Sequence, residues 1–242
     1  MLVKSKIKDI QSLAGKKYRD QAGLFLAEGP KLVEELLRDC SHSIKAIYAL
    51  ESWIQQNKII NSSIQVTLVT PAELERLSQL ITPHEVLAVV SKFPISPLQI
   101  DKGLTLVCCG IQDPGNFGTI LRTADWFGVR QLVCSPDTVD VYNPKVVQAT
   151  MGSIARLAVH YMDLDPWLNE QEVPIYAAIL NGQSVYEINR SQSGILLIGN
   201  EAKGVPASLL TKKVTGITIP KIGEAESLNA AVATGILLSW LS

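Results

Sequence analysis

The residues of this chain that could do chemistry lie in three short segments of its second half, each directly after an apolar run. They comprise one arginine, one carboxylate, one hydroxyl and two amides: Arg122, Glu201, Ser227, Asn116 and Asn229. An arginine carries a positive charge, and the other four side chains can donate or accept hydrogen bonds. Each side chain alone also has an ordinary structural explanation, so the order and spacing of the three segments matter more than any single residue.

The first segment begins with the turn sequence DPGN at 113–116, and Asn116 can start the helix that we expect over 116–128. Apolar residues at i, i+4 and i+7 share one face of that helix, which leaves Arg122 on the opposite side. By itself Arg122 reads as a solvated helix arginine.

The second segment places Glu201 between Gly199 and Gly204, two glycines that allow the backbone to approach a ligand. In the third segment, Ser227 is well placed as the N-cap of the closing helix, with Asn229 in its first turn. Taken separately, these are a glycine-punctuated loop and an ordinary helix cap.

The elements that carry these loops alternate between apolar strands and helices. Expected strands are 105–111, 131–135, 175–179, 194–199 and 216–220, and expected helices are 116–128, 143–152, 206–213 and 227–241. The strands show no clean period of two, which predicts a parallel sheet that is buried on both faces. Because ligands bind at the carboxyl ends of strands in open α/β sheets, the three polar loops are expected to form the functional site.

A linker with two prolines and a terminal glycine, FPISPLQIDKG at 93–103, separates this region from the first part of the chain. We therefore expect two domains, 1–97 and 98–242. The first is predicted to be small and mixed α/β, because it combines an amphipathic helix over 29–40 with short apolar strands at 44–50 and 64–70.

Composition excludes several classes of protein. The chain has 242 residues, of which 47% are hydrophobic and 19% are charged, so neither a disordered chain nor a coiled coil is expected. It has no apolar stretch of about 20 residues and no apolar signal-peptide core, which favours a cytoplasmic protein. The four cysteines are expected to be buried, reduced thiols: Cys40, Cys108, Cys109 and Cys134.

The usual catalytic and cofactor motifs are also missing. The three histidines lack partners at metal-ligand spacing, so no metal is expected. GNEAKG has the glycine spacing of a phosphate loop, but Val205 stands where the lysine is needed. Neither a GxGxxG dinucleotide fingerprint nor a GxSxG nucleophile elbow occurs.

Together the three segments closely resemble the signature motifs of the SpoU (TrmH-type) methyltransferases of the SPOUT superfamily. Those motifs read DPxNxGxxxRTAxxFGV, then GxExxG, then IPxxGxxxSLNxxxA, and the match spans residues 110–235 in unbroken order. One departure follows Asn229, where the family commonly has Val-Ser and this chain has Ala230-Ala231. That change bears on packing or fine positioning rather than on the chemistry.

The resemblance implies an α/β fold whose C-terminal segment, roughly 195–242, is threaded into a deep trefoil knot, an exception to the rule against knots. It implies that S-adenosylmethionine binds bent within the knot against backbone from three loops. The matching cofactor positions are Gly199, Ile219, Leu228 and the turn Leu180, Asn181 and Gly182. Glycine and apolar residues suit adenine, which main-chain groups can read in a mostly apolar cleft.

The acceptor implied for this branch is a ribose 2'-hydroxyl. Arg122 matches the arginine proposed as the base in the family, a strained role for a group that stays protonated. The alternative is that Arg122 grips the adjacent phosphate and stabilises alkoxide charge, while the proton leaves to phosphate or water. Asn116 would orient the arginine or the RNA, and Glu201, Ser227 and Asn229 complete the matched polar set. Family members are homodimers whose pocket combines both chains, so an isologous dimer is expected.

The N-terminal segment 17–37 resembles the opening of the substrate-binding domain of ribosomal RNA members, which is similar to small ribosomal proteins. Residues 1–20 are also locally basic, with six basic and two acidic side chains, and such an arm can meet phosphates. The candidate RNA contacts are Lys16, Lys17, Arg19, Glu28 and Lys31. We therefore expect a methyltransferase for ribosomal RNA, most simply 23S. The alternatives are a transfer RNA ribose methyltransferase and a non-catalytic RNA-binding protein of the same fold.

Overall fold

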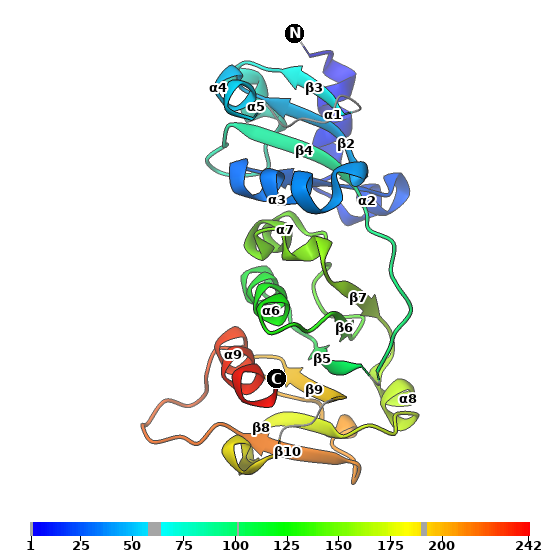
Figure 1. Ribbon diagram of the computed structural model, residues 1–242, viewed down its shortest axis with the longest axis vertical. Coiled ribbons are helices and arrows are strands. Elements are labelled where there is room, and N and C mark those ends of the chain that lie inside the picture. The colour runs from blue at the N-terminus through cyan, green and yellow to red at the C-terminus, as the bar shows by residue number, and fades with distance from the viewer. Residues whose placement is uncertain (1, 58–63, 101, 190–192) are drawn as a thin grey trace. The chain divides into compact units, whose positions relative to one another are not determined.

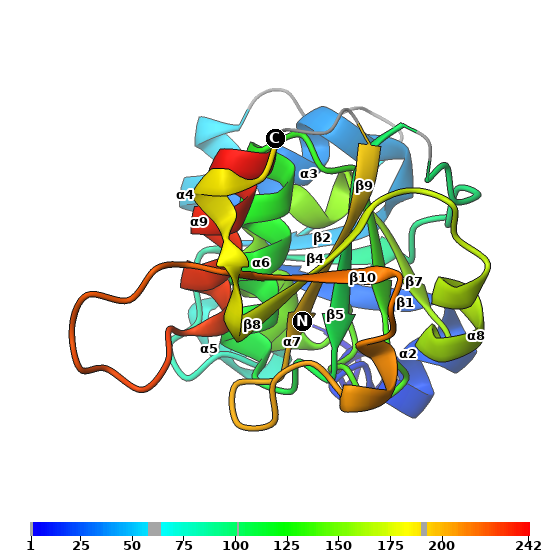
Figure 2. The same cartoon turned by 90° about the horizontal axis from the view of Figure 1, so that it is seen from below.

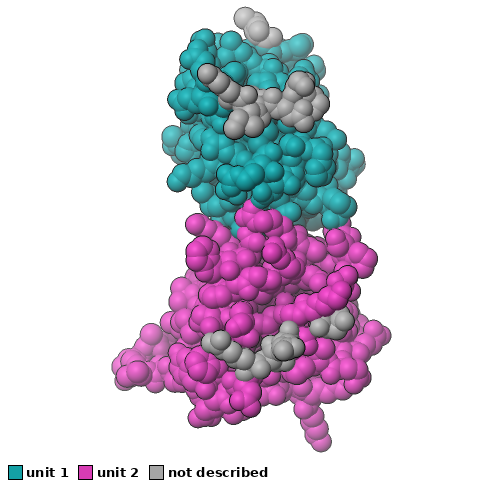
Figure 3. Space-filling view, viewed as in Figure 1, with its two compact units in different colours: residues 1–94, 140–155 teal, residues 95–139, 156–242 magenta. Residues whose placement is uncertain are grey.

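The computed structural model describes residues 2–57, 64–100, 102–189 and 193–242. The chain divides into two compact units (Figure 3), one of residues 1–94 and 140–155, the other of residues 95–139 and 156–242. Residues 140–155 thus pack with the first unit. The sequence pattern places them, with the helix expected over 143–152, among the strands and helices of the second domain. The functional domain limits 1–97 and 98–242 stay a prediction.

The first unit is built around a mixed four-stranded sheet in the order β1-β4-β2-β3. Its strands are β1 (Leu24–Glu28), β2 (Ile44–Ala49), β3 (Gln65–Leu68) and β4 (Val86–Ser91). Its α-helices are α1 (Lys4–Ser12), α2 (Lys16–Ala22), α3 (Pro30–Cys40), α4 (Glu51–Gln56), α5 (Pro71–Leu77) and α7 (Pro144–Thr150). The predicted helix over 29–40 and the strands at 44–50 and 64–70 are confirmed, whereas β1 and β4 were not predicted.

Two helices of this unit close one apolar core together with the sheet. Ile7 and Ile10 from α1 and Leu74 and Leu77 from α5 are buried in a cluster with residues of β1, β2 and β4. The α5 helix starts with a capping box, in which the Thr70 side chain accepts from the Glu73 backbone and the Glu73 carboxylate accepts from Thr70.

The segment 140–155 is attached to the first unit by buried polar and aromatic contacts. Arg19, only 2% exposed, donates to the Asp140 carboxylate at 2.6 Å and to the backbone oxygens of two residues that precede α2. Tyr142 packs against Phe25 with ring centroids 4.9 Å apart, and its hydroxyl accepts from the Phe93 amide. A buried ion pair and a ring cluster therefore fix this segment to the unit's sheet.

The second unit is a parallel six-stranded sheet in the order β10-β8-β9-β5-β6-β7. Its strands are β5 (Gly103–Cys109), β6 (Gln131–Cys134), β7 (Ala158–Tyr161), β8 (Ile175–Ser184), β9 (Ser193–Gly199) and β10 (Val214–Thr218). The predicted parallel sheet is confirmed, and β7 is an edge strand that was not predicted. The central strands β5 and β9 are almost entirely buried, which explains their continuous apolar runs.

Helices cover both faces of this sheet (Figures 1 and 2). Helices α6 (Pro114–Trp126) and α9 (Ala230–Leu241) pack side by side on one face, and α8 (Leu164–Asn169) lies on the other. The carboxyl ends of β5, β9 and β10 lead into the three polar segments. The fold class is therefore α/β as predicted, while the trefoil knot stays a prediction.

Three local expectations were wrong. The predicted helix over 206–213 is only a 3₁₀ turn, Ala207–Leu209, because most of its residues are exposed and offer no apolar face. The α6 helix begins at Pro114, capped by Asp113 rather than by Asn116. The α9 helix begins at Ala230, capped by Asn229 rather than by Ser227.

The described helices include none that is long and apolar enough to cross a membrane.

Candidate active site

A chain of two side-chain hydrogen bonds joins the three polar segments. The Nδ2 group of Asn229 donates to Oδ1 of Asn116 at 2.8 Å, and Nδ2 of Asn116 donates to Oε1 of Glu201 at 2.6 Å. One residue comes from each segment, although Asn116 and Glu201 stand 85 positions apart in sequence. The structure thus brings together three of the five predicted catalytic residues.

Asn116 is held by the start of α6. The Asp113 carboxylate caps this helix and accepts the backbone N–H of Asn116 at 2.7 Å, and Pro114 occupies the first helical position, where no N–H is needed. The Asn116 side chain is half-buried. Its amide N–H donates to Glu201 and its amide oxygen accepts from Asn229. The Asn116 amide therefore fixes the positions of Asn229 and Glu201 relative to each other.

Glu201 is positioned by a tight loop after β9. The Asn200 side chain donates to the Gly110 carbonyl at 2.8 Å and accepts from the backbone amides of Ala202 and Lys203. This Asx-type turn ties the loop to the end of β5, where the first polar segment starts. Glu201 therefore faces Asn116 because its neighbour Asn200 anchors the loop.

Gly199 and Gly204 let this loop close on itself. The backbones of Asn200 and Gly204 exchange two hydrogen bonds, and a Cβ on Gly199 would lie 2.1 Å from the Gly204 carbonyl carbon. Gly204 has φ +67°, a left-handed conformation that glycine adopts without strain. Glycine is required at both positions by the backbone itself.

Asn229 serves the cluster and its own helix at once. Its Oδ1 accepts from the backbone amides of Ala231 at 2.9 Å and Val232 at 3.3 Å, while its Nδ2 reaches Asn116. Ala230 and Ala231, where the sequence departs from the family pattern, are each 6% exposed and pack inside the unit. Both small side chains therefore lie in packed surroundings.

Arg122 and Ser227 stand outside the hydrogen-bonded chain. Arg122 lies on the exposed side of α6, as its position relative to the apolar face predicts, and makes no hydrogen bond or ion pair in the described part of the chain. Ser227 lies in the exposed stretch before α9. Both side chains are available to a ligand or to a second chain.

Among the predicted cofactor residues, Leu180, Asn181 and Gly182 lie where β8 and β10 change register, and Ile219 directly follows β10. Gly199 is the last residue of β9, and Leu228 precedes α9. Pairing jumps from Gly216↔Ala177 to Ile217↔Gln183, so residues 178–182 have no register partner on β10. The Thr218 hydroxyl donates to the Leu180 carbonyl at 3.0 Å, which fixes this excursion beside the end of β10. Irregular strands of this kind recur next to functional sites.

This region combines close backbone packing with exposed apolar side chains. A Cβ on Gly182 would lie 2.6 Å from Gly216, so only glycine lets the two strands approach. Leu180 is 69% exposed and Leu228 is 47% exposed. Exposed apolar side chains beside glycine backbone fit a flat, partly apolar ligand such as adenine.

The Cys109 thiol lies buried at the end of β5. Burial raises the pKa of Cys109 to about 12, so its thiol stays protonated at neutral pH and is a poor nucleophile. The described residues contain no group of three or more side chains suited to a metal ion.

The candidate RNA contacts of the first unit divide into two groups. Lys16, Lys17 and Lys31 are exposed, and Lys16 forms an ion pair with Asp20. Arg19 is buried in its pair with Asp140. Glu28 is 5% exposed and accepts hydrogen bonds from Ser78 and Gln79. The last two side chains stabilise the unit and face no solvent, so only the lysines are available to RNA.

Sequence reasoning missed three residues that shape the site: Asp113, Asn200 and Thr218. Asp113 precedes a proline and Asn200 sits between glycine and glutamate in a turn, so capping and Asx-turn preferences could have identified both. Thr218 carried no such signal, because its partner Leu180 is distant in sequence.

Comparison with known proteins shows the family to which the chain belongs. Residues 103–239 match the SpoU rRNA Methylase family, and residues 4–88 match the MRM3-like substrate binding domain. The 23S rRNA (guanosine(2553)-2'-O)-methyltransferase RlmP of Bacillus subtilis is 34% identical over 240 residues, which cover 98% of this chain and 95% of that protein.

Solved structures show the same architecture. A putative RNA methyltransferase of the TrmH family from Porphyromonas gingivalis superposes with a TM-score of 0.88 at 35% identity, covering 100% of this chain and 98% of that one. An AdoMet-bound rRNA methyltransferase from Sinorhizobium meliloti gives 0.85 at 30% identity, with coverages of 98% and 94%.

The chain belongs to the SpoU rRNA methylase family. It is an S-adenosylmethionine-dependent RNA methyltransferase with an N-terminal substrate-binding domain.

Proposed function

We propose that this protein transfers the methyl group of S-adenosylmethionine to a ribose 2'-hydroxyl of 23S ribosomal RNA in the cytoplasm. The observation that carries the proposal is the hydrogen-bonded chain Asn229–Asn116–Glu201, which unites all three family motifs in one place. The name of the Bacillus relative and the substrate-binding domain over 4–88 support the ribosomal substrate.

The cofactor would lie against Gly199, Ile219, Leu228 and the 180–182 turn, where exposed leucines and glycine backbone suit adenosine. When bound, it supplies a methyl group already activated by a sulfonium charge. The protein must then align the acceptor oxygen and manage its proton.

Arg122 would grip the phosphate next to the target ribose and stabilise the alkoxide charge as it develops. Its guanidinium cannot accept a proton at neutral pH, so the proton leaves to phosphate or water. The Glu201 carboxylate holds Asn116 in one orientation, and Asn116 and Ser227 then orient the RNA. Each of these roles needs a polar group that is fixed before the substrate arrives.

A homodimer would complete the site. Helices α6 and α9 form one face of the second unit, and this face exposes Trp126 by 85% and Val232 by 51%, beside Arg122 on the same helix as Trp126. Exposed large apolar side chains on paired helices favour an isologous interface. Arg122 would then serve the pocket of the second copy, and Lys16, Lys17 and Lys31 would meet RNA phosphates.

The test is transfer of a labelled methyl group from S-adenosylmethionine to 23S ribosomal RNA and, separately, to transfer RNA. We expect label in ribosomal RNA, in a linkage that resists alkaline hydrolysis because the 2'-oxygen is methylated. Arg122→Ala should abolish transfer, while Arg130→Ala, which removes an exposed arginine just beyond α6, should retain it.

Label in transfer RNA alone would contradict the ribosomal substrate and leave the reaction standing. Tight RNA binding with no transfer to either RNA, or to ribosome assembly intermediates, would instead identify a non-catalytic binding protein.

A further inference from the structure

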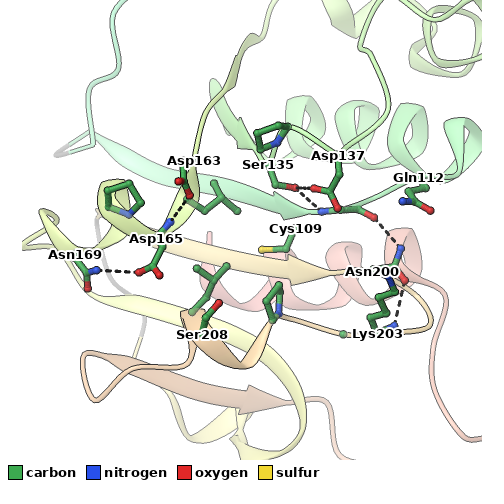
Figure 4. A pocket seen from close by; sticks show the side chains of 17 residues that line it. Cys109, Gln112, Ser135, Asp137, Asp163, Asp165, Asn169, Asn200, Lys203 and Ser208 are labelled. Carbon is green, nitrogen blue, oxygen red and sulfur yellow. Dashed lines mark hydrogen bonds between the residues drawn. The ribbon is translucent and has the colours of Figure 1, made fainter.

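A cavity of about 630 Å³ opens at the carboxyl ends of β5 and β9, on the α8 side of the second unit (Figure 4). From β5 the chain proceeds outward to β6 and β7, whereas β8 and β10 lie beyond β9 on the other side. The cavity thus lies at the point where the strand order reverses, the general ligand position of open α/β sheets. The cofactor residues described above do not line it.

The catalytic loop forms one wall of this cavity. Asn200, Lys203 and Gly204 line it, while Glu201, between them, bonds to Asn116 in the active site. A ligand in the cavity and a ribose at the active site would therefore touch the same short loop. The cavity and the active site could thus hold two parts of one RNA substrate.

The lining has an apolar floor and a polar rim. Cys109, Leu164 and Leu209 are buried and form the floor, which suits the flat face of a nucleobase. The charged rim residues are three carboxylates and one ammonium group: Asp137, Asp163, Asp165 and Lys203. In Figure 4 the α8 carboxylates lie at one end of the lining, and Asn200 and Lys203 at the other.

Asp137 is held in place before any ligand binds. The Ser135 hydroxyl donates to its Oδ1 at 2.5 Å and accepts the Gly110 backbone N–H at 2.8 Å. A Cβ on Gly110, which has φ +69°, would lie 2.8 Å from Oδ2 of Asp137, so the carboxylate occupies space that only glycine leaves open. In the described part of the chain, that Oδ2 makes no hydrogen bond.

We propose that this cavity receives a guanine base of the RNA substrate, which makes it a base-reading subsite of the methyltransferase; the inference rests on the proposed function. A carboxylate only accepts hydrogen bonds, and its two oxygens can take two neighbouring donors. Guanine offers such a pair, N1–H and the N2 amino group, with the O6 acceptor alongside for Lys203. Adenine, cytosine and uracil present no two neighbouring N–H groups on that edge.

The charges also decide which part of the RNA enters. Three carboxylates repel phosphate, so the backbone stays outside and a splayed base enters, the usual mode for sequence-specific recognition of RNA. Lys203, which makes no side-chain hydrogen bond or ion pair in the described part of the chain, can meet the O6 oxygen without losing a partner.

The first experiment titrates the full-length, ¹⁵N-labelled protein with guanosine, inosine and uridine and follows backbone amide shifts. We expect guanosine to shift the amides of Gly110, Asn200 and Lys203. Inosine, which lacks the N2 amino group, should bind about tenfold more weakly, and uridine more weakly still.

The second experiment uses Asp137→Asn, with Asp9→Asn, an exposed aspartate of α1, as the matched control. Asp137→Asn should weaken guanosine binding about tenfold and lower kcat/KM for ribosomal RNA mainly through a higher KM. The control should behave as wild type in both measurements.

Equal shifts with guanosine and uridine, or an unaltered KM in Asp137→Asn, would overturn the guanine subsite while methyl transfer to ribosomal RNA upheld the proposed function. Shifts produced by spermidine or Mg²⁺ but not by guanosine would identify a cation site and equally overturn it. Guanosine binding in a protein that methylates no RNA would refute the proposed function instead.

Discussion

Asn116 donates its side-chain N–H to Glu201 at 2.6 Å, linking the start of α6 to the loop after β9. A hydrogen bond to an ionised carboxylate is short and about twice as strong as one between neutral groups. This bond therefore sets the distance between two motifs that stand 85 positions apart in the sequence, and Asn229 extends the hydrogen-bonded chain to the third.

Asn116→Asp should lower methyl transfer at least about 100-fold, because it replaces the donor to Glu201 with a second carboxylate and so separates the two loops. Asp113 still caps α6 through the backbone, so circular dichroism and the unfolding midpoint should change little. Steady-state transfer to ribosomal RNA measures the effect. If the variant transfers methyl groups at a rate within twofold of wild type, the hydrogen-bonded chain Asn229–Asn116–Glu201 has only a structural role.

Arg122→Lys keeps the positive charge but loses the planar fork that grips phosphate. We expect a rate reduced by at least about tenfold, with a pH–rate profile of unchanged shape, because the substitution replaces one cationic side chain with another. A profile whose rising limb moves with the substitution would show instead that residue 122 is the base.

Gly199→Ala should destabilise the protein by at least about 3 kcal/mol, because the new methyl group would meet the rigid backbone of Gly204 at 2.1 Å. The matched control is Gly223→Ala, whose added Cβ would have no neighbour within 4 Å and which should change stability by no more than about 1 kcal/mol. Urea unfolding of both variants makes the comparison, and equal midpoints would contradict it.

Arg19→Ala should cost about 3 to 5 kcal/mol of unfolding free energy, because it leaves the Asp140 carboxylate without its buried partner. Lys16→Ala, at an exposed ion pair, should cost less than about 1 kcal/mol. Urea unfolding again provides the measurement. A similar small loss in both variants would mean that the Arg19 pair contributes nothing to holding residues 140–155.

The pH dependence of stability should reveal Glu28. Burial raises the pKa of its carboxyl above the ordinary 4.5, against the opposing hydrogen bonds from Ser78 and Gln79. The folded state therefore keeps this proton longer than the unfolded state, so this group's contribution to stability falls as pH rises above about 4.5 and levels off once the folded carboxyl has ionised.

Glu28→Gln should remove that decline, since glutamine does not titrate and can still pair with Ser78 and Gln79. The difference in unfolding free energy between wild type and variant, measured by urea from pH 4.5 to 7, isolates this group from other carboxylates such as Asp20. The pKa of the Asp20 carboxyl is lowered to about 2, mainly by its hydrogen bond to Lys16 and next by its hydrogen bond to Lys92. A difference that stays constant with pH would contradict the prediction.

Local pattern alone determined the parallel sheet, the family motifs and the exposed side of α6 that carries Arg122. These follow from residue periods and turn chemistry, which act over a few positions. The helix expected over 206–213 failed because Leu209 alone of its residues is buried and the others are exposed, so that a single 3₁₀ turn formed instead.

Tertiary structure alone decided which polar groups meet. Arg19 counted in the sequence as one more basic residue of an exposed arm, yet its pairing with Asp140, 121 positions away, makes it part of the core. The orientation of Glu201 depends on two contacts between distant segments, the hydrogen bond from Asn200 to the Gly110 carbonyl and the hydrogen bond from Asn116 to Glu201. Such contacts depend on how distant segments pack, and the residue types next to each position in the chain carry no record of that packing.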